Sequence, residues 1–184
     1  MTKNDPKIDG SRIKQIKQNG QKGQNGQGKK MVEPTIIANY GDPSVGKTKS
    51  ILMAYEKLKK VETSKSGFVP HYDNDDICDV LVINGIKVGI CSQGDPRSCQ
   101  KGWMDILVNQ QKCAIILAAC RYMGATTTLI ESYQQKGYRI YWTCNARLYE
   151  RNTDPRIAPK GIQTRFNDQW ATEIANLIEA WCYA

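Results

Sequence analysis

The sequence contains a single histidine, His71, and its seven cysteines include no CxxC pair. A zinc site of histidine and cysteine therefore lacks ligands, and a Ser-His-Asp site would depend on His71 as its only base. The longest apolar run, Cys113–Cys120, is far shorter than the about 18 residues of a membrane-spanning helix. Residues 1–30 lack the apolar core of a signal peptide. We therefore expect a cytoplasmic protein with reduced thiols, no disulfide framework and no contact with a membrane.

Acidic residues are scarce near the start of the chain. The 184 residues carry a net charge of +8, and residues 1–30 hold eight Lys or Arg against two acidic residues. Residues 11–30 consist mainly of Lys, Gln, Asn and Gly without an aromatic residue, so they cannot bury enough surface to offset the entropy of ordering. We predict a flexible basic tail over residues 1–30 and one domain over residues 31–184. The alternative to a merely solvated tail is a basic arm that would contact nucleic acid weakly and in a salt-dependent way.

Apolar patterns in residues 31–184 alternate between strands and helices. Strands are predicted at Thr35–Tyr40, Ile77–Ile83, Ile86–Ser92, Cys113–Cys120 and Tyr138–Cys144. Helices are predicted at Thr48–Lys60, from Pro96 onward, from Thr128 to before Gly137, and at Asp168–Cys182. Val61–Asp76 is predicted as a loop, and Asn84-Gly85 as a hairpin turn. This order predicts an α/β fold of three layers, with a mainly parallel sheet that includes one antiparallel hairpin strand.

A complete loop motif stands between the first predicted strand and the first predicted helix. Residues 41–48 match the pattern G-x-x-x-x-G-K-[ST], with the sequence Gly41-Asp42-Pro43-Ser44-Val45-Gly46-Lys47-Thr48. The glycines allow backbone N–H groups to surround phosphate oxygens, and the helix N-terminus attracts the same anion. In this pattern Lys47 reaches the β and γ phosphates, and the Thr48 hydroxyl binds magnesium.

With this motif after a strand and before a helix, the chain resembles the P-loop NTPase superfamily over residues 34–60. The resemblance implies a three-layer α/β fold that binds ATP or GTP with Mg²⁺. It also implies the phosphate and metal roles of Lys47, Thr48 and the loop backbone. We expect ATP, because the guanine-recognition pattern [NT]-K-x-D occurs at Thr2–Asp5, ahead of the loop and without a strand before it.

None of the predicted strands ends directly in the acidic residue that holds magnesium in that superfamily. The best candidate is Asp95, three residues beyond Ser92, and it serves equally well as the N-cap of the helix that Pro96 opens. Other carboxylates flank the hairpin and are expected to be solvated or to form turns: Asp75, Asp76 and Asp79. Without an acidic residue at the usual position, efficient hydrolysis needs a different metal ligand.

Arginines follow several predicted strands, where ligands gather in open α/β sheets. Arg121 and Arg147 are placed to meet phosphate and to neutralise the charge that develops in phosphoryl transfer. Gly94-Asp95-Pro96-Arg97 also resembles the D-G-x-P-R segment of nucleoside monophosphate kinases, with Gly and Asp in reverse order, which would give Arg97 a substrate phosphate. The predicted catalytic residues are Lys47, Asp95, Arg121 and Arg147, and the predicted metal ligands are Thr48 and Asp95.

These observations predict a protein that binds ATP with magnesium and hydrolyses the β–γ bond. Two alternatives stay open. The first is a kinase that transfers the phosphoryl group to a small molecule or a nucleotide. The second is a non-enzymatic module whose interactions depend on the bound nucleotide, with a protein partner or a second copy of the chain.

Overall fold

A computed structural model describes residues 32–42, 45–145 and 160–184. It divides the chain into residues 1–30 and residues 31–184, and all described residues belong to the second unit. The predicted tail lies outside the described residues, so its character stays a prediction. Within the described part of the chain, no helix combines the length and apolar character needed to cross a membrane.

Six strands form one mixed sheet, and most of them run in parallel. Their order in the sheet is β2-β3-β4-β5-β1-β6. Strand β1 pairs in parallel with β5 and β6, and β4 pairs in parallel with β5, whereas β3 pairs antiparallel with both β2 and β4. The strands are β1 (Thr35–Tyr40), β2 (His71–Asp73), β3 (Asp76–Ile83), β4 (Ile86–Cys91), β5 (Ile115–Cys120) and β6 (Arg139–Thr143). The predicted α/β class and mainly parallel sheet are confirmed.

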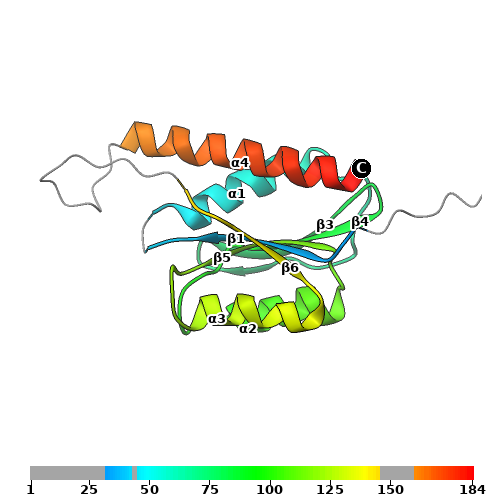
Figure 1. Ribbon diagram of the computed structural model, residues 1–184. Helices are drawn as coiled ribbons and strands as arrows, with labels where there is room; N and C mark the ends of the chain where they lie inside the picture. The colour runs from blue at the N-terminus through cyan, green and yellow to red at the C-terminus, as the bar shows by residue number, and fades with distance from the viewer. Residues whose placement is uncertain (1–31, 43–44, 146–159) are drawn as a thin grey trace, which may run out of the picture. The chain divides into compact units, whose positions relative to one another are not determined.

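Helices cover both faces of the sheet. Figure 1 shows α1 and α4 on one face and α2 and α3 on the other. The helices are α1 (Lys47–Lys59), α2 (Gln100–Asp105), α3 (Ala125–Ser132) and α4 (Lys160–Tyr183), with the π-helical turn η2 (Ile106–Gln110) after α2 and the 3₁₀ turn η3 (Tyr133–Lys136) after α3.

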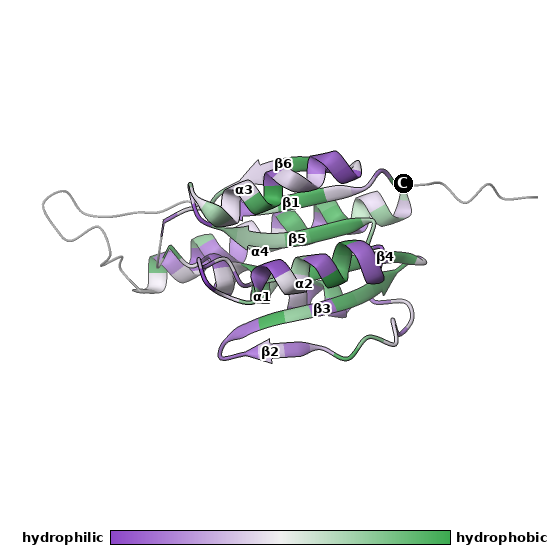
Figure 2. Cartoon of the chain, turned by 90° about the horizontal axis from the view of Figure 1, so that it is seen from below, coloured by the Kyte–Doolittle hydropathy of each residue, from purple (hydrophilic) through white to green (hydrophobic). Residues whose placement is uncertain are grey.

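The core consists of two apolar layers, one on each face of the sheet. Successive side chains of a strand point to opposite faces, so Ile37 of β1 packs in the layer under α1 and α4, while Ile36 and Ala38 pack in the layer under α2 and α3. Figure 2 shows β3, β4 and β5 in the hydrophobic colour and the edge strand β2 in the hydrophilic one. Burial on two faces explains why the central strands read as continuous apolar runs.

Several predicted features of the secondary structure are wrong. The predicted loop at Val61–Asp76 contains β2, an exposed edge strand of three residues that shows no apolar period. Thr128 does not open a helix, because α3 begins at Ala125 after Gly124. Helix α4 begins at Lys160, eight residues before the predicted start at Asp168. The Asn84-Gly85 turn is confirmed, since both residues have a positive φ, at 48° and 75°.

Candidate functional site

The loop between β1 and α1 turns sharply into the helix. Gly46 is the residue before the first turn of α1 and has a φ of 85°, a left-handed conformation that favours glycine. Within the loop, Val45 is buried and Asp42 is exposed. Pro43 and Ser44, two of the predicted phosphate-binding residues, lie outside the described residues. The strand, loop and helix therefore follow one another as the motif predicts.

Lys47 begins α1 and folds back under the loop. Its side chain is 7% exposed, and its Nζ donates to the carbonyl oxygen of Gly41 at 2.8 Å and to that of Asp42 at 2.6 Å. Burial lowers the pKa of Lys47 below its ordinary value, and the nearby Arg121 guanidinium lowers it further. An anionic ligand beside Lys47 would raise this pKa again, since an opposite charge at close range favours the charged form.

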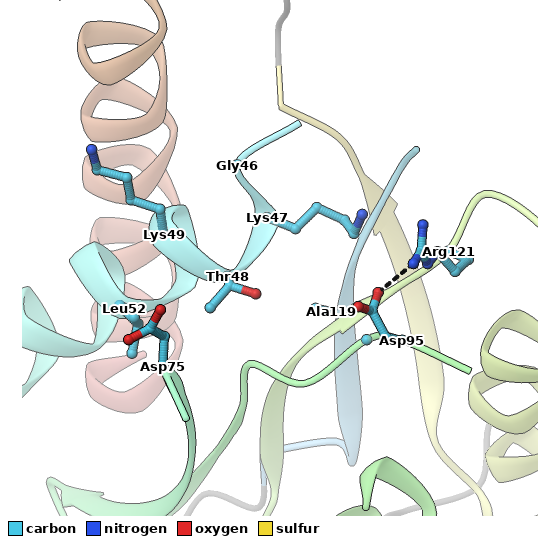
Figure 3. A pocket seen from close by; sticks show the side chains of 10 residues that line it. Gly46, Lys47, Thr48, Lys49, Leu52, Asp75, Asp95, Ala119 and Arg121 are labelled. Carbon is cyan, nitrogen blue, oxygen red and sulfur yellow. Dashed lines mark ion pairs between the residues drawn. The ribbon is translucent and has the colours of Figure 1, made fainter. Parts of the chain in front are cut away.

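A cavity of about 580 Å³ opens at the carboxyl ends of β4 and β5, beside the start of α1. Figure 3 shows the Lys47 ammonium directed toward Asp95 and Arg121, which enter from the ends of these two strands. The lining residues are Gly46, Lys47, Thr48, Lys49, Leu52, Asp75, Gly94, Asp95, Ala119 and Arg121. Four of the predicted site residues, Lys47, Thr48, Asp95 and Arg121, thus meet in one cavity together with the loop residue Gly46.

Asp95 is not the N-cap of a helix. Helix α2 begins five residues later, at Gln100, because Arg97 has a φ of 69° and interrupts the helical backbone. The Asp95 carboxylate instead forms an ion pair with Arg121, with 2.7 Å between Oδ1 and Nη2. The Nε of Arg121 is buried and has no hydrogen-bond partner among the described residues. The Arg121 guanidinium lines the cavity and carries more N–H donors than its ion pair with Asp95 uses, so it can also bind an oxygen anion there.

The oxygen atoms in the cavity suit magnesium. Thr48 supplies a hydroxyl, which donates to the Ser92 carbonyl at 3.4 Å, and Asp75 and Asp95 supply carboxylates. In the described part of the chain, no three His, Cys, Asp or Glu residues form a metal-binding group. Mg²⁺ does not require one, since it keeps several water ligands and uses one or two carboxylates together with phosphate oxygens.

Asp79 has a different role from the predicted one. It is neither solvated nor in a turn: its carboxylate is buried in β3 and accepts from the Tyr55 hydroxyl at 2.7 Å and from the Val80 N–H at 2.7 Å. Burial, together with this bond to Asp79, raises the pKa of Tyr55 far above its ordinary value. The Tyr55–Asp79 pair therefore links α1 to β3 beneath the site.

Sequence reasoning missed three buried asparagines behind the loop: Asn39, Asn145 and Asn167. They lie on β1, just after β6 and on α4, and they are hydrogen-bonded to one another. Their separation along the sequence hides the cluster. The available signal was the amide side chain at position 39 in a mostly apolar strand, since a buried amide requires a hydrogen-bond partner. Arg147, the other predicted catalytic arginine, lies outside the described residues.

No protein-family model, curated protein or solved structure matches this chain. The motif and the geometry of the cavity are therefore the features that bear on the function of this chain.

Replacing Gly46 tests the fit of the loop against α4. A Cβ at this position would lie 2.6 Å from Asn167 Nδ2, and its backbone would keep a φ of 85°. We expect Gly46→Ala to lower the free energy of unfolding by about 2–4 kcal/mol, from the left-handed backbone and the overpacking together. The melting temperature should fall by about 5–10 °C.

Gly102→Ala is the matched control. A Cβ there would meet nothing within 4 Å, and the residue lies within α2, where alanine is favoured over glycine. Its melting temperature should stay level or rise. Equal melting temperatures of Gly46→Ala and the wild type would contradict the tight fit between Gly46 and Asn167.

Proposed function

We propose that this protein is a member of the P-loop NTPase superfamily that binds ATP with magnesium and hydrolyses the bond between the β and γ phosphates. The observation that carries this proposal is the position of Lys47. Lys47 belongs to a complete G-x-x-x-x-G-K-[ST] motif and lies at a strand–loop–helix junction. It also lines a cavity together with a second cation, Arg121. Two cations and the N-terminus of a helix match the charge of a triphosphate.

The described residues divide the work of phosphoryl transfer among them. Lys47 would exchange the carbonyls of Gly41 and Asp42 for β and γ phosphate oxygens, and Arg121 would bind the oxygens of the transferred group. Thr48 would hold Mg²⁺, with Asp95 directly or through water, and the bound ion would neutralise charge on the β and γ phosphates. Water accepts the phosphoryl group as the bond to the bridging oxygen breaks, which yields ADP and phosphate. The rate comes from positioning and charge stabilisation.

A second cavity favours one alternative, a kinase. It measures about 490 Å³, shares Asp95 with the first cavity, and lies between the residues before α2 and the start of α3. Arg97 and Lys101 line it together with the apolar side chains of Pro96 and Leu129. An acceptor bound there would lie across Asp95 from the phosphates.

One assay separates these two reactions. Labelled ATP with Mg²⁺ is incubated with the full-length protein, with and without pooled nucleosides and nucleotides, and the products are resolved by thin-layer chromatography. Hydrolysis predicts labelled phosphate in both samples, whereas a kinase predicts a new labelled product that requires the pool. Binding of ATP without turnover in either sample would favour the interaction module.

We also propose a reducing, cytoplasmic location and a weak contact between the basic tail and nucleic acid. Five of the seven cysteines pack in the two core layers as small apolar side chains.

Deleting residues 1–30 should leave the melting temperature and the ATP affinity nearly unchanged, because the segment has little to bury. Calorimetry and thermal melting check this expectation.

Nucleic-acid binding by the full-length protein should disappear with the same deletion and should weaken steeply as salt is added. A large fall in melting temperature after the deletion would instead mean that the tail packs on the domain or on another subunit.

A further inference from the structure

Three buried asparagines form a hydrogen-bonded cluster directly behind the loop. Asn39 Nδ2 donates to Asn145 Oδ1 at 3.0 Å, and Asn145 Nδ2 donates to Asn167 Oδ1 at 3.1 Å. The three side chains are 0%, 8% and 2% exposed, respectively. Buried amide side chains lower stability unless their hydrogen bonds are made. Three of them in one cluster therefore indicate that the groups bonded to them are held in a particular orientation.

The cluster reaches the backbone of the loop through Asn145. Its Nδ2 lies 3.4 Å from the carbonyl oxygen of Val45 and also donates to the hydroxyl of Ser50. Ser50 is fully buried, and its Oγ donates to the carbonyl oxygen of Gly46 at 2.9 Å. The two successive carbonyls on either side of the Gly46 Cα therefore face Asn145 and Ser50.

Holding these carbonyls also orients the amides that follow them. In a trans peptide unit the C=O and the next N–H point in opposite directions. With the Val45 and Gly46 carbonyls directed at Asn145 and Ser50, the N–H groups of Gly46 and Lys47 point away from the cluster. Gly46 and Lys47 both line the cavity, so these two amides are available to an anion there.

Asn167 fixes the same loop from the side of α4. It fills the space that a side chain on Gly46 would occupy, and its Oδ1 accepts from both Asn145 and Gln163, the latter at 2.9 Å. The next residue, Asp168, forms an ion pair with Lys57 of α1, with 3.0 Å between the charged atoms. Helix α4 is therefore attached both to the loop and to the helix that follows the loop.

We infer that Asn145 and Asn167 are positioning residues, which hold the amides of Gly46 and Lys47 in the orientation that receives the triphosphate. This inference rests on the proposed function. It assigns α4, none of whose described side chains lines the cavity, an indirect part in phosphate binding. Misplacement of such amides by about 1 Å is enough to cost orders of magnitude in rate or affinity.

The test compares Asn145→Ala and Asn167→Ala with the wild type in the full-length protein. Affinities for ATP–magnesium and for inorganic tripolyphosphate are measured by calorimetry well below the melting temperature. Tripolyphosphate has no base or sugar, so its affinity reports only on contacts with the phosphate groups. We expect each variant to bind both ligands about tenfold more weakly or worse. Hydrogen exchange of the amides in the segment 41–48 should also become faster without ligand, because the loop is no longer held.

Thr143→Val is the matched control. It removes the bond that the Trp170 Nε1–H donates to Thr143 Oγ1 at 3.0 Å, which ties α4 to β6 without touching the loop. This variant should melt at a lower temperature and bind both ligands as the wild type does. Asn167→Ala carries the test if Asn145→Ala does not fold, since it leaves the Asn39, Val45 and Ser50 bonds of Asn145 in place.

The outcomes separate the two proposals. Wild-type affinity in the folded asparagine variants, or an equal loss in Thr143→Val, would overturn the positioning role and leave the proposed function standing. Failure of the wild-type protein to bind either ligand would overturn the proposed function and this inference with it.

Discussion

Lys47→Ala should abolish measurable ATP binding while leaving the fold intact. The ammonium donates to the loop carbonyls of Gly41 and Asp42, and a triphosphate would replace these neutral acceptors with charged phosphate oxygens. Loss of such contacts costs about 1.5–3 kcal/mol or more, which is about 10- to 150-fold in affinity. The melting temperature should change little, because the charge that burial disfavours is removed along with its two hydrogen bonds.

Lys60→Ala provides the same change of charge at the other end of α1, where the side chain is exposed. Calorimetry with ATP–magnesium should find this control equal to the wild type. Undiminished binding by Lys47→Ala would remove the loop from the phosphate site and with it the P-loop assignment.

Asp95→Asn should lower magnesium-dependent turnover at least about tenfold, which corresponds to about 1.4 kcal/mol of barrier. The substitution keeps the shape of the side chain and an oxygen that can accept from Arg121, but it removes the charge that would hold Mg²⁺. The melting temperature should stay within a few degrees, because the Asp95 side chain is 67% exposed and an exposed ion pair contributes at most about 1 kcal/mol.

Asp75→Asn is the informative companion, because Asp75 is the other carboxylate in the cavity lining. A loss of turnover in Asp75→Asn with normal turnover in Asp95→Asn would transfer the metal role to Asp75. Normal turnover in both variants would mean that neither carboxylate holds a catalytic metal, and binding without turnover in the wild type would favour the interaction module.

The central part of the fold was predictable because its signals are local. Strand β5 is an apolar run from Ile115 to Cys120, and a run of that length is typical of a strand buried on both faces. The start of α2 was not predictable, because Asp95-Pro96 is a good helix opening and only the positive φ of Arg97 prevents it. Strand β2 carries no periodic signal, since it lies at the sheet edge and its pairing with β3 defines it.

The residues of the candidate site also fall into those that a local sequence pattern reveals and those that it does not. Lys47 and Thr48 are identified by a contiguous motif, and Arg121 by its place after a buried strand. The cluster of Asn39, Asn145 and Asn167 joins three segments that are far apart in the sequence, so no local pattern reveals it. Asn167 in particular lies on α4 but one residue before the predicted helix start at Asp168, so the predicted helix did not include it.

The contact between Asn167 and the loop has a consequence for synthesis on the ribosome. The motif at residues 41–48 emerges early, but the side chains that orient it belong to residues translated more than 90 positions later. Chains grow from the N-terminus, and segments whose partners have not yet been made remain unpaired. The proposed nucleotide binding should therefore be absent from a nascent chain that ends before residue 167. It should appear once residue 167 has left the ribosome and can pack against the loop.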